Sequence, residues 1–91
     1  MPELIQCATA GTMESSDAYV EIEPRENGLE IQLESVVFAQ FGEDIAQSVQ
    51  AVLLQQGVKN AWISVNDRGA LDCVIRARIE TAIRRARGET P

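Results

Sequence analysis

Histidine is absent from this chain of 91 residues, and cysteine is rare. Without histidine there is no imidazole general base, no Ser–His or Cys–His nucleophile pair and no histidine-ligated zinc site. The two cysteines, Cys7 and Cys73, are too few for a disulfide framework and do not form a metal-type pair. We therefore expect no metal site, and cysteines that serve as small apolar side chains of a reduced protein. An independent enzyme would have to work with carboxylates, arginines or Lys59.

Aromatic residues, basic residues and long apolar runs are also few. Aromatic residues make up only 4% of the chain, so the core must be mainly aliphatic. No apolar run has the length of a membrane span and no signal-peptide pattern opens the chain, so we expect a cytoplasmic protein without a membrane partner. The net charge is −6, and the first forty residues contain a single base, Arg25. This balance argues against nucleic acid as the main partner.

The length and an apolar content of 45% are typical of one domain, which we expect to span 1–91 with an ordered core at about 5–87. Alternating apolar and polar residues predict strands over 5–13, 18–24 and 29–35. Residues 14–17 are typical of a turn, and the Asn27-Gly28 pair predicts a hairpin. The first forty residues therefore predict a three-stranded antiparallel meander with one side facing solvent.

The apolar period then changes to three or four residues, which predicts an amphipathic helix over about 36–56. Ser35 is its expected N-cap and Gly57 its expected left-handed stop. A short strand over 61–66 and a turn at 66–69 precede a last helix that Asp72 opens. The order βββαβα predicts an α+β fold, a two-layer sandwich with two helices packed on one face of a four-stranded, mainly antiparallel sheet. If the strands flanking the first helix run parallel, the crossover is expected to be right-handed.

Two serines, Ser15 and Ser16, lie between the acids Glu14 and Asp17 in the first predicted turn. Residue chemistry alone is typical of an ordinary turn. A turn tip is also where a modifying enzyme reaches a hydroxyl, because tips are exposed and tolerate added groups. No base is present nearby to activate either serine as a catalytic nucleophile, so the functional alternative is modification by another enzyme.

Three other features have both a structural and a functional interpretation. The turn at 66–69 is a tight connection or a contact for a ligand, and Trp62 is a core residue or an interface anchor. The arginines of the last helix form a solvated face, or they dock an acidic subunit or a phosphate-rich arm. These arginines are Arg76, Arg78, Arg84, Arg85 and Arg87.

Three segments, Ala10–Ser15, the Phe41-Gly42 pair and Val65–Arg78, resemble the citrate lyase acyl carrier protein family, the gamma subunit. The likeness covers about residues 7–86. It implies that a serine carries 2′-(5″-phosphoribosyl)-3′-dephospho-CoA through a phosphodiester bond. By position this serine is Ser15; Ser16, which stands where the family commonly has Gly, is the second choice.

The resemblance further implies a non-catalytic carrier subunit, a phosphoprotein of citrate fermentation with no catalytic residues of its own. Its arm would shuttle acetyl and citryl thioesters between the alpha subunit, a CoA-transferase, and the beta subunit, a lyase, as citrate is cleaved to oxaloacetate and acetate. A prosthetic-group transferase and an acetate:carrier ligase are its other implied partners. Two alternatives are the carrier subunit of malonate decarboxylase and a non-carrier α+β adaptor that binds proteins through its acidic sheet face. An independent small enzyme comes last.

Overall fold

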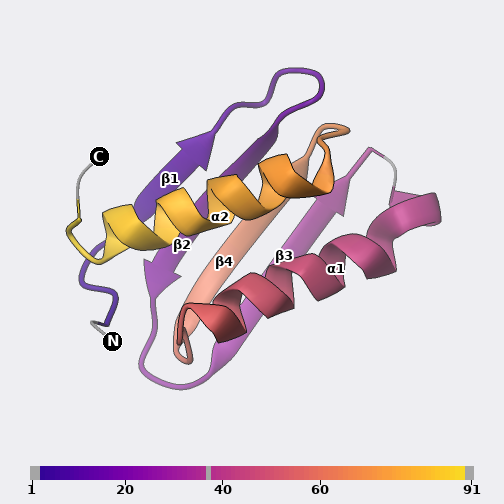
Figure 1. The fold of residues 1–91 in the computed structure, drawn as a ribbon. Coiled ribbons are helices and arrows are strands. Elements are labelled where there is room, and N and C mark those ends of the chain that lie inside the picture. The colour runs from indigo at the N-terminus through magenta and orange to yellow at the C-terminus, as the bar shows by residue number, and fades with distance from the viewer. Residues whose placement is uncertain (1–2, 37, 90–91) are drawn as a thin grey trace.

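The computed structural model describes residues 3–36 and 38–89. Its elements are β1 (Ala8–Gly11), β2 (Ala18–Pro24), β3 (Leu29–Ser35), α1 (Phe38–Gln55), β4 (Ala61–Asp67) and α2 (Asp72–Ala86). Figure 1 shows both helices lying side by side on one face of a four-stranded sheet. The predicted order βββαβα and the two-layer α+β architecture are confirmed.

The strands do not form the expected meander. Their order is β1-β2-β4-β3, so that β4 lies between β2 and β3. Strand β2 pairs antiparallel with β4, whereas β3 pairs parallel with β4. The Gly28 amide donates to Asn60 Oδ1 at 2.8 Å and the Gly28 carbonyl accepts from the Ala61 amide at 3.0 Å. The predicted hairpin at Asn27-Gly28 is therefore wrong, because this turn bonds to the start of β4 instead of joining two neighbouring strands.

Burial explains why β4 takes the central position. Its alternate residues Ala61, Ile63 and Val65 are fully buried, whereas the corresponding β3 residues Ile31 and Leu33 are only half-buried. A strand rich in apolar side chains removes the most apolar surface from water when it has a neighbouring strand at each edge. Long-range burial therefore overrides the local turn signal.

The β3–α1–β4 crossover also differs from the expectation. In Figure 1, α1 lies in front of the sheet, and β4 lies to the left of β3 when these parallel strands are turned to point upward. This arrangement is left-handed, not right-handed. A right-handed crossover into the same position would place α1 on the opposite face of the sheet, where the exposed side chains of Glu30, Gln32 and Glu34 lie. Burial of the apolar face outweighs the usual preference.

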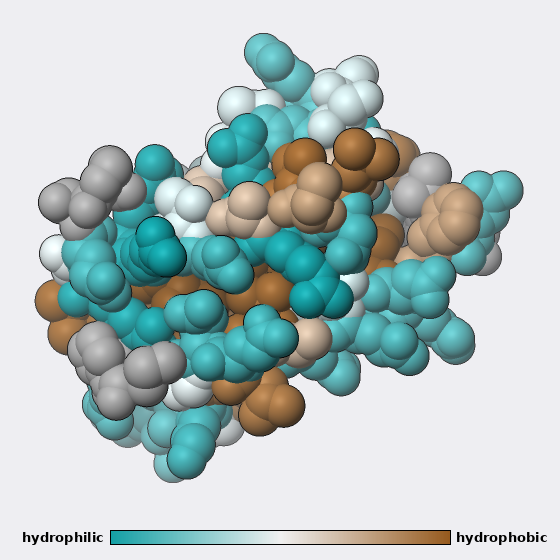
Figure 2. Space-filling model, viewed as in Figure 1, coloured by the Kyte–Doolittle hydropathy of each residue, from teal (hydrophilic) through white to brown (hydrophobic). Residues whose placement is uncertain are grey.

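The core lies between the helices and the sheet. Figure 2 shows hydrophobic atoms along the line between the two helices, surrounded by hydrophilic surface. The fully buried side chains of three or more carbons include Val20, Ile22, Val49, Val52, Leu53, Ile63, Val65, Ile75, Ile79 and Ile83. Cys7 and Cys73 do not join this core, since both are free and exposed. Their expected apolar role is therefore wrong.

The two predicted ends of the first helix have different outcomes. Helix α1 begins at Phe38 and Ser35 ends β3, but residue 37 between them lies outside the described residues, so the N-cap at Ser35 stays a prediction. The C-terminal prediction is confirmed: Gly57 has a φ of +70°. Its amide donates to the Leu54 carbonyl and the Val58 amide donates to the Leu53 carbonyl. These two bonds form a Schellman motif.

The other face of the sheet carries polar and acidic side chains and no helix. Glu21, Glu30 and Glu34 are exposed there, and Trp62 is half-buried among them. Trp62 thus belongs to the uncovered face and not to the core. Neither helix in the described part of the chain has the length and hydropathy that a membrane span requires.

Candidate functional site

Residues 12–17, the serine loop, connect β1 to β2 at the end of the sheet where β3 and β4 also finish. Ser15 and Ser16 are both exposed, and the predicted turn is confirmed. Ser16 has a φ of +67°, a left-handed conformation that residues other than Gly rarely adopt. Among the described residues, no hydrogen bond engages the Ser15 hydroxyl. Ser15 therefore presents an unused hydroxyl at the tip of a turn.

Hydrogen bonds within the loop fix its shape. The Thr12 hydroxyl donates to Asp17 Oδ2 at 2.7 Å and accepts from the Glu14 amide at 3.2 Å. The Asp17 amide donates to the Glu14 carbonyl at 3.2 Å. These bonds enclose both serines, so the loop has a defined conformation.

Gly11 allows the loop to close. It has a φ of +89°, and a Cβ atom at this position would lie 1.8 Å from the Ala18 carbonyl oxygen. That separation is far below van der Waals contact with a backbone atom that cannot move aside. Only glycine fits where β1 passes into the serine loop.

Asp67 organises the neighbouring turn between β4 and α2. Its side chain is fully buried, and its Oδ1 accepts from the Gly69 amide at 3.2 Å and the Ala70 amide at 2.8 Å. Its Oδ2 accepts from the Ser35 hydroxyl at 2.7 Å. The turn predicted at 66–69 is confirmed, but its dependence on a buried carboxylate was missed. The Asx-turn chemistry of aspartate was the available signal.

This turn holds the serine loop through the backbone of Arg68. The Ser16 amide donates to the Arg68 carbonyl at 2.8 Å, and the Arg68 amide donates to the Asp17 carbonyl at 2.9 Å. Helix α2 adds a second link, because Arg78 donates to both carboxylate oxygens of Asp17, at 3.0 and 3.1 Å. The Arg78 guanidinium, with the Thr12 hydroxyl, lowers the pKa of Asp17 from 3.8 to about 2. The segments 10–15 and 65–78, distant in sequence, therefore meet in one structure.

The other arginines of α2 are mostly occupied by the protein itself. Arg76 pairs with Asp72 at 2.8 Å, and Arg85 donates to the Thr9 carbonyl at 2.8 Å. Arg87 donates to the Gln56 carbonyl. The Arg85 and Arg87 contacts brace the C-terminal end of the helix against β1 and the end of α1, whereas the Arg76–Asp72 pair lies within α2. A purely solvated face therefore does not describe them, and docking of an acidic subunit or a phosphate-rich arm stays a prediction.

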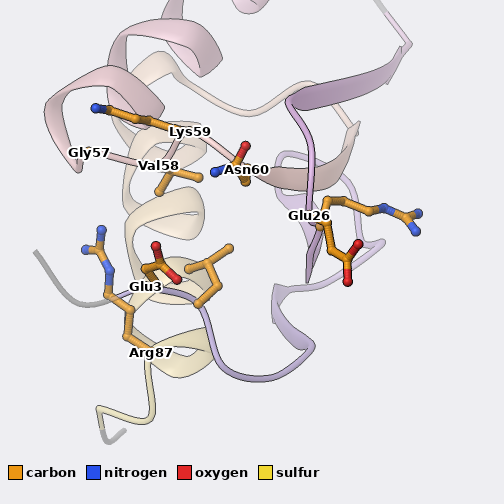
Figure 3. A pocket seen from close by; sticks show the side chains of 9 residues that line it. Glu3, Glu26, Gly57, Val58, Lys59, Asn60 and Arg87 are labelled. Atoms are coloured by element: carbon orange, nitrogen blue, oxygen red, sulfur yellow. The ribbon is translucent and has the colours of Figure 1, made fainter.

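A separate hollow of about 700 Å³ lies at the opposite end of the sheet. Residues from four parts of the chain line it, and Figure 3 shows Glu3 and Arg87 on one side and Glu26 on the other. The hollow borders residues that precede β4, whereas the serine loop borders the end of β4. Its lining mixes both signs of charge. No group of three or more potential His, Cys, Asp or Glu metal ligands occurs within residues 3–36 and 38–89.

Comparison with known proteins identifies the family. Residues 5–86 match the family model ACP, described as malonate decarboxylase delta subunit. The chain is 46% identical over 84 residues to the citrate lyase acyl carrier protein of Rhodopseudomonas palustris, covering 92% of this chain and 87% of the relative. It is 48% identical over 87 residues to that of Haemophilus ducreyi, covering 96% and 90%. The chain belongs to the citrate lyase acyl carrier protein family.

A solved structure shares the family fold. One chain of a Pseudomonas malonate decarboxylase hetero-tetramer, crystallised in complex with malonate, superposes with a TM-score of 0.78. The match covers 94% of this chain and 92% of that chain at 24% identity. This likeness shows that the two-layer fold is common to both proteins.

Proposed function

We propose that the chain is the acyl carrier subunit of citrate lyase and that Ser15 is the attachment residue for its covalent arm. The observation that carries this proposal is the state of Ser15. Its hydroxyl is exposed and makes no hydrogen bond to the described residues, at the tip of a loop that Asp67, Arg68 and Arg78 hold in place. The names of the relatives support a carrier role.

The residues present fit a group such as 2′-(5″-phosphoribosyl)-3′-dephospho-CoA. A phosphodiester on the Ser15 hydroxyl would break no hydrogen bond of the described residues, and the arm would extend into solvent from an exposed tip. When bound, the group supplies a thiol that carries acyl chains as thioesters. The chain itself contributes the hydroxyl, a rigid mounting and a surface for other subunits. Ser16 is the second choice, because its hydroxyl is also exposed.

The proposed partners are the alpha and beta subunits of citrate lyase, the prosthetic-group transferase and the acetate:carrier ligase. A tethered acyl group meets each active site at high effective concentration and is not lost to solvent. Two exposed apolar side chains lie beside the turn that holds the serine loop: the Val36 amide donates to the Asp67 carbonyl, and Leu71 follows the turn at 66–69. Figure 2 shows hydrophobic atoms over the start of α2, in the direction of this end. A partner that reaches Ser15 would meet them.

A carrier of malonate decarboxylase is the second candidate, favoured by the family description and by the shared fold. The relatives at 46–48% identity favour citrate lyase. Reconstitution separates the two: the loaded chain should restore citrate cleavage to citrate lyase catalytic subunits. Restoration of malonate decarboxylation alone would favour the second candidate.

Intact mass tests the attachment. We expect the chain made with its attachment enzymes to gain the mass of one phosphoribosyl-dephospho-CoA unit, and Ser15→Ala to lose this gain while Ser16→Ala keeps it. Loss in Ser16→Ala alone would move the site by one residue. If wild type gains no mass while the same enzymes load a known carrier, the carrier proposal fails and the adaptor alternative remains.

A further inference from the structure

The basic side chains differ in whether the protein already uses them. All eight Lys and Arg residues lie within the described residues. Five make hydrogen bonds or ion pairs within the protein: Arg25, Arg76, Arg78, Arg85 and Arg87. The side chains of Lys59, Arg68 and Arg84 make none among the described residues. Lys59 lines the distant hollow and Arg84 lies in the last turn of α2. Arg68 is therefore the unengaged cation beside the serine loop.

The backbone of Arg68 is fixed next to Ser15. Two backbone hydrogen bonds, of 2.8 and 2.9 Å, join Arg68 to Ser16 and Asp17. Ser16 and Asp17 thus both face Arg68, the two-against-one arrangement of a β-bulge. Asp67, fully buried, anchors the preceding position. The long Arg68 side chain is exposed, so its guanidinium is free to turn toward a group on Ser15.

The charges around the loop leave a place for an anion. Asp17 is neutralised by Arg78 and Asp72 by Arg76. Glu14 remains as an exposed carboxylate next to Ser15, so an added phosphodiester would be repelled by Glu14 unless a cation balanced it. Guanidinium groups bind phosphate oxygens through two parallel hydrogen bonds, which an ammonium does not reproduce.

We propose that Arg68 binds the phosphodiester through which the arm is attached to Ser15, and so sets the direction in which the arm leaves the protein. This inference rests on the proposed function. The Arg68 side chain then acts as a binding group for the attached arm, while only the Arg68 backbone supports the unmodified loop. Because the pair is exposed, salt should weaken it.

Phosphorus-31 NMR of the loaded protein tests the proposal directly. The phosphodiester resonance of wild type should differ from that of Arg68→Gln. This difference should shrink as salt rises to 1 M, where the Debye length is about 3 Å. Arg84→Gln is the matched control, since it removes another unengaged exposed arginine, and it should leave the resonance unchanged. Arg68→Lys keeps the charge without the two-point geometry and should fall between wild type and Arg68→Gln.

Thermal unfolding gives a second readout. We compare the unfolding midpoint of the loaded protein with that of the same protein without the arm. The difference, loaded minus unmodified, should be higher for wild type than for Arg68→Gln by roughly 1–5 °C. Unmodified wild type and unmodified Arg68→Gln should unfold within about 2 °C of one another. Intact mass comes first: no gain in wild type would defeat the carrier proposal itself. Full loading with identical resonances and identical midpoint changes in wild type and Arg68→Gln would overturn the role of Arg68 alone.

Discussion

Arg78 on α2 and Asp17 in the serine loop form a two-point ion pair across 61 residues of sequence. The Nε–Oδ1 distance is 3.0 Å and the Nη2–Oδ2 distance is 3.1 Å. The Asp17 side chain is only 15% exposed. The position of the serine loop therefore depends on a helix at the other end of the chain.

Acid should weaken this link. Because the pKa of Asp17 is lowered from 3.8 to about 2, its contribution to stability is complete above about pH 4 and is lost as the pH falls toward 2. We expect Asp17→Asn to unfold at a lower temperature than wild type at pH 7, with the difference narrowing between pH 4 and 2. Calorimetry over this range checks it, with Asp44→Asn as an exposed control. A difference that stays constant with pH would contradict the assignment.

Gly11→Ala should be severely destabilising. The new Cβ would overlap the Ala18 carbonyl, and the φ of +89° is unfavourable for alanine, so we expect a loss of at least about 3 kcal/mol in the free energy of unfolding. Gly28→Ala is the matched control, since Gly28 also has a positive φ but no atom within 4 Å of the added carbon. It should cost about 1 kcal/mol. Urea unfolding measures both, and equal losses would show that contact with Ala18 is unimportant.

Ser16→Gly should stabilise the protein. At a φ of +67°, serine carries a conformational cost of about 1–2 kcal/mol that glycine avoids, although glycine loses more entropy on folding. The expected net gain is about 0.5–1 kcal/mol in urea unfolding. Ser15→Gly, at a residue without a positive φ, should give no gain. A loss of stability in Ser16→Gly would mean that the Ser16 side chain has a role of its own.

Asp67→Ala should disrupt the turn that supports Arg68. The Gly69 and Ala70 amides and the Ser35 hydroxyl would all lose the buried Asp67 carboxylate as acceptor, at a cost of at least about 2 kcal/mol. Asn66→Ala, one residue earlier on the opposite face of β4, should cost less than about 1 kcal/mol. Faster hydrogen exchange of the Ser16 amide in Asp67→Ala would link the turn to the serine loop. Unchanged exchange would show that the two loops are independent.

The sequence predicts the bounds of the strands and helices better than it predicts which strands pair and which side chains meet. Strands and helices follow from local periodicity, so four of the six elements lie within two residues of the expectation at both ends, and the last helix begins at the expected Asp72. The serine turn is found in its predicted place. The pairing of β3 was wrong because Asn27-Gly28 describes only a local bend, whereas the burial of Ile63 and Val65 decides which strand is central. The Asp17–Arg78 pair depends on topology, and no spacing in the sequence indicates it.

The central position of β4 has a consequence for synthesis. Strands β2 and β3 pair with β4 and not with one another, so the first sixty residues cannot complete the sheet as they leave the ribosome. The Ser16 amide finds its partner only once Arg68 has been added, and the Asp17 carboxylate finds its ion-pair partner only after Arg78. A modifying enzyme that recognises the ordered loop would therefore act on finished chains and pass over nascent ones.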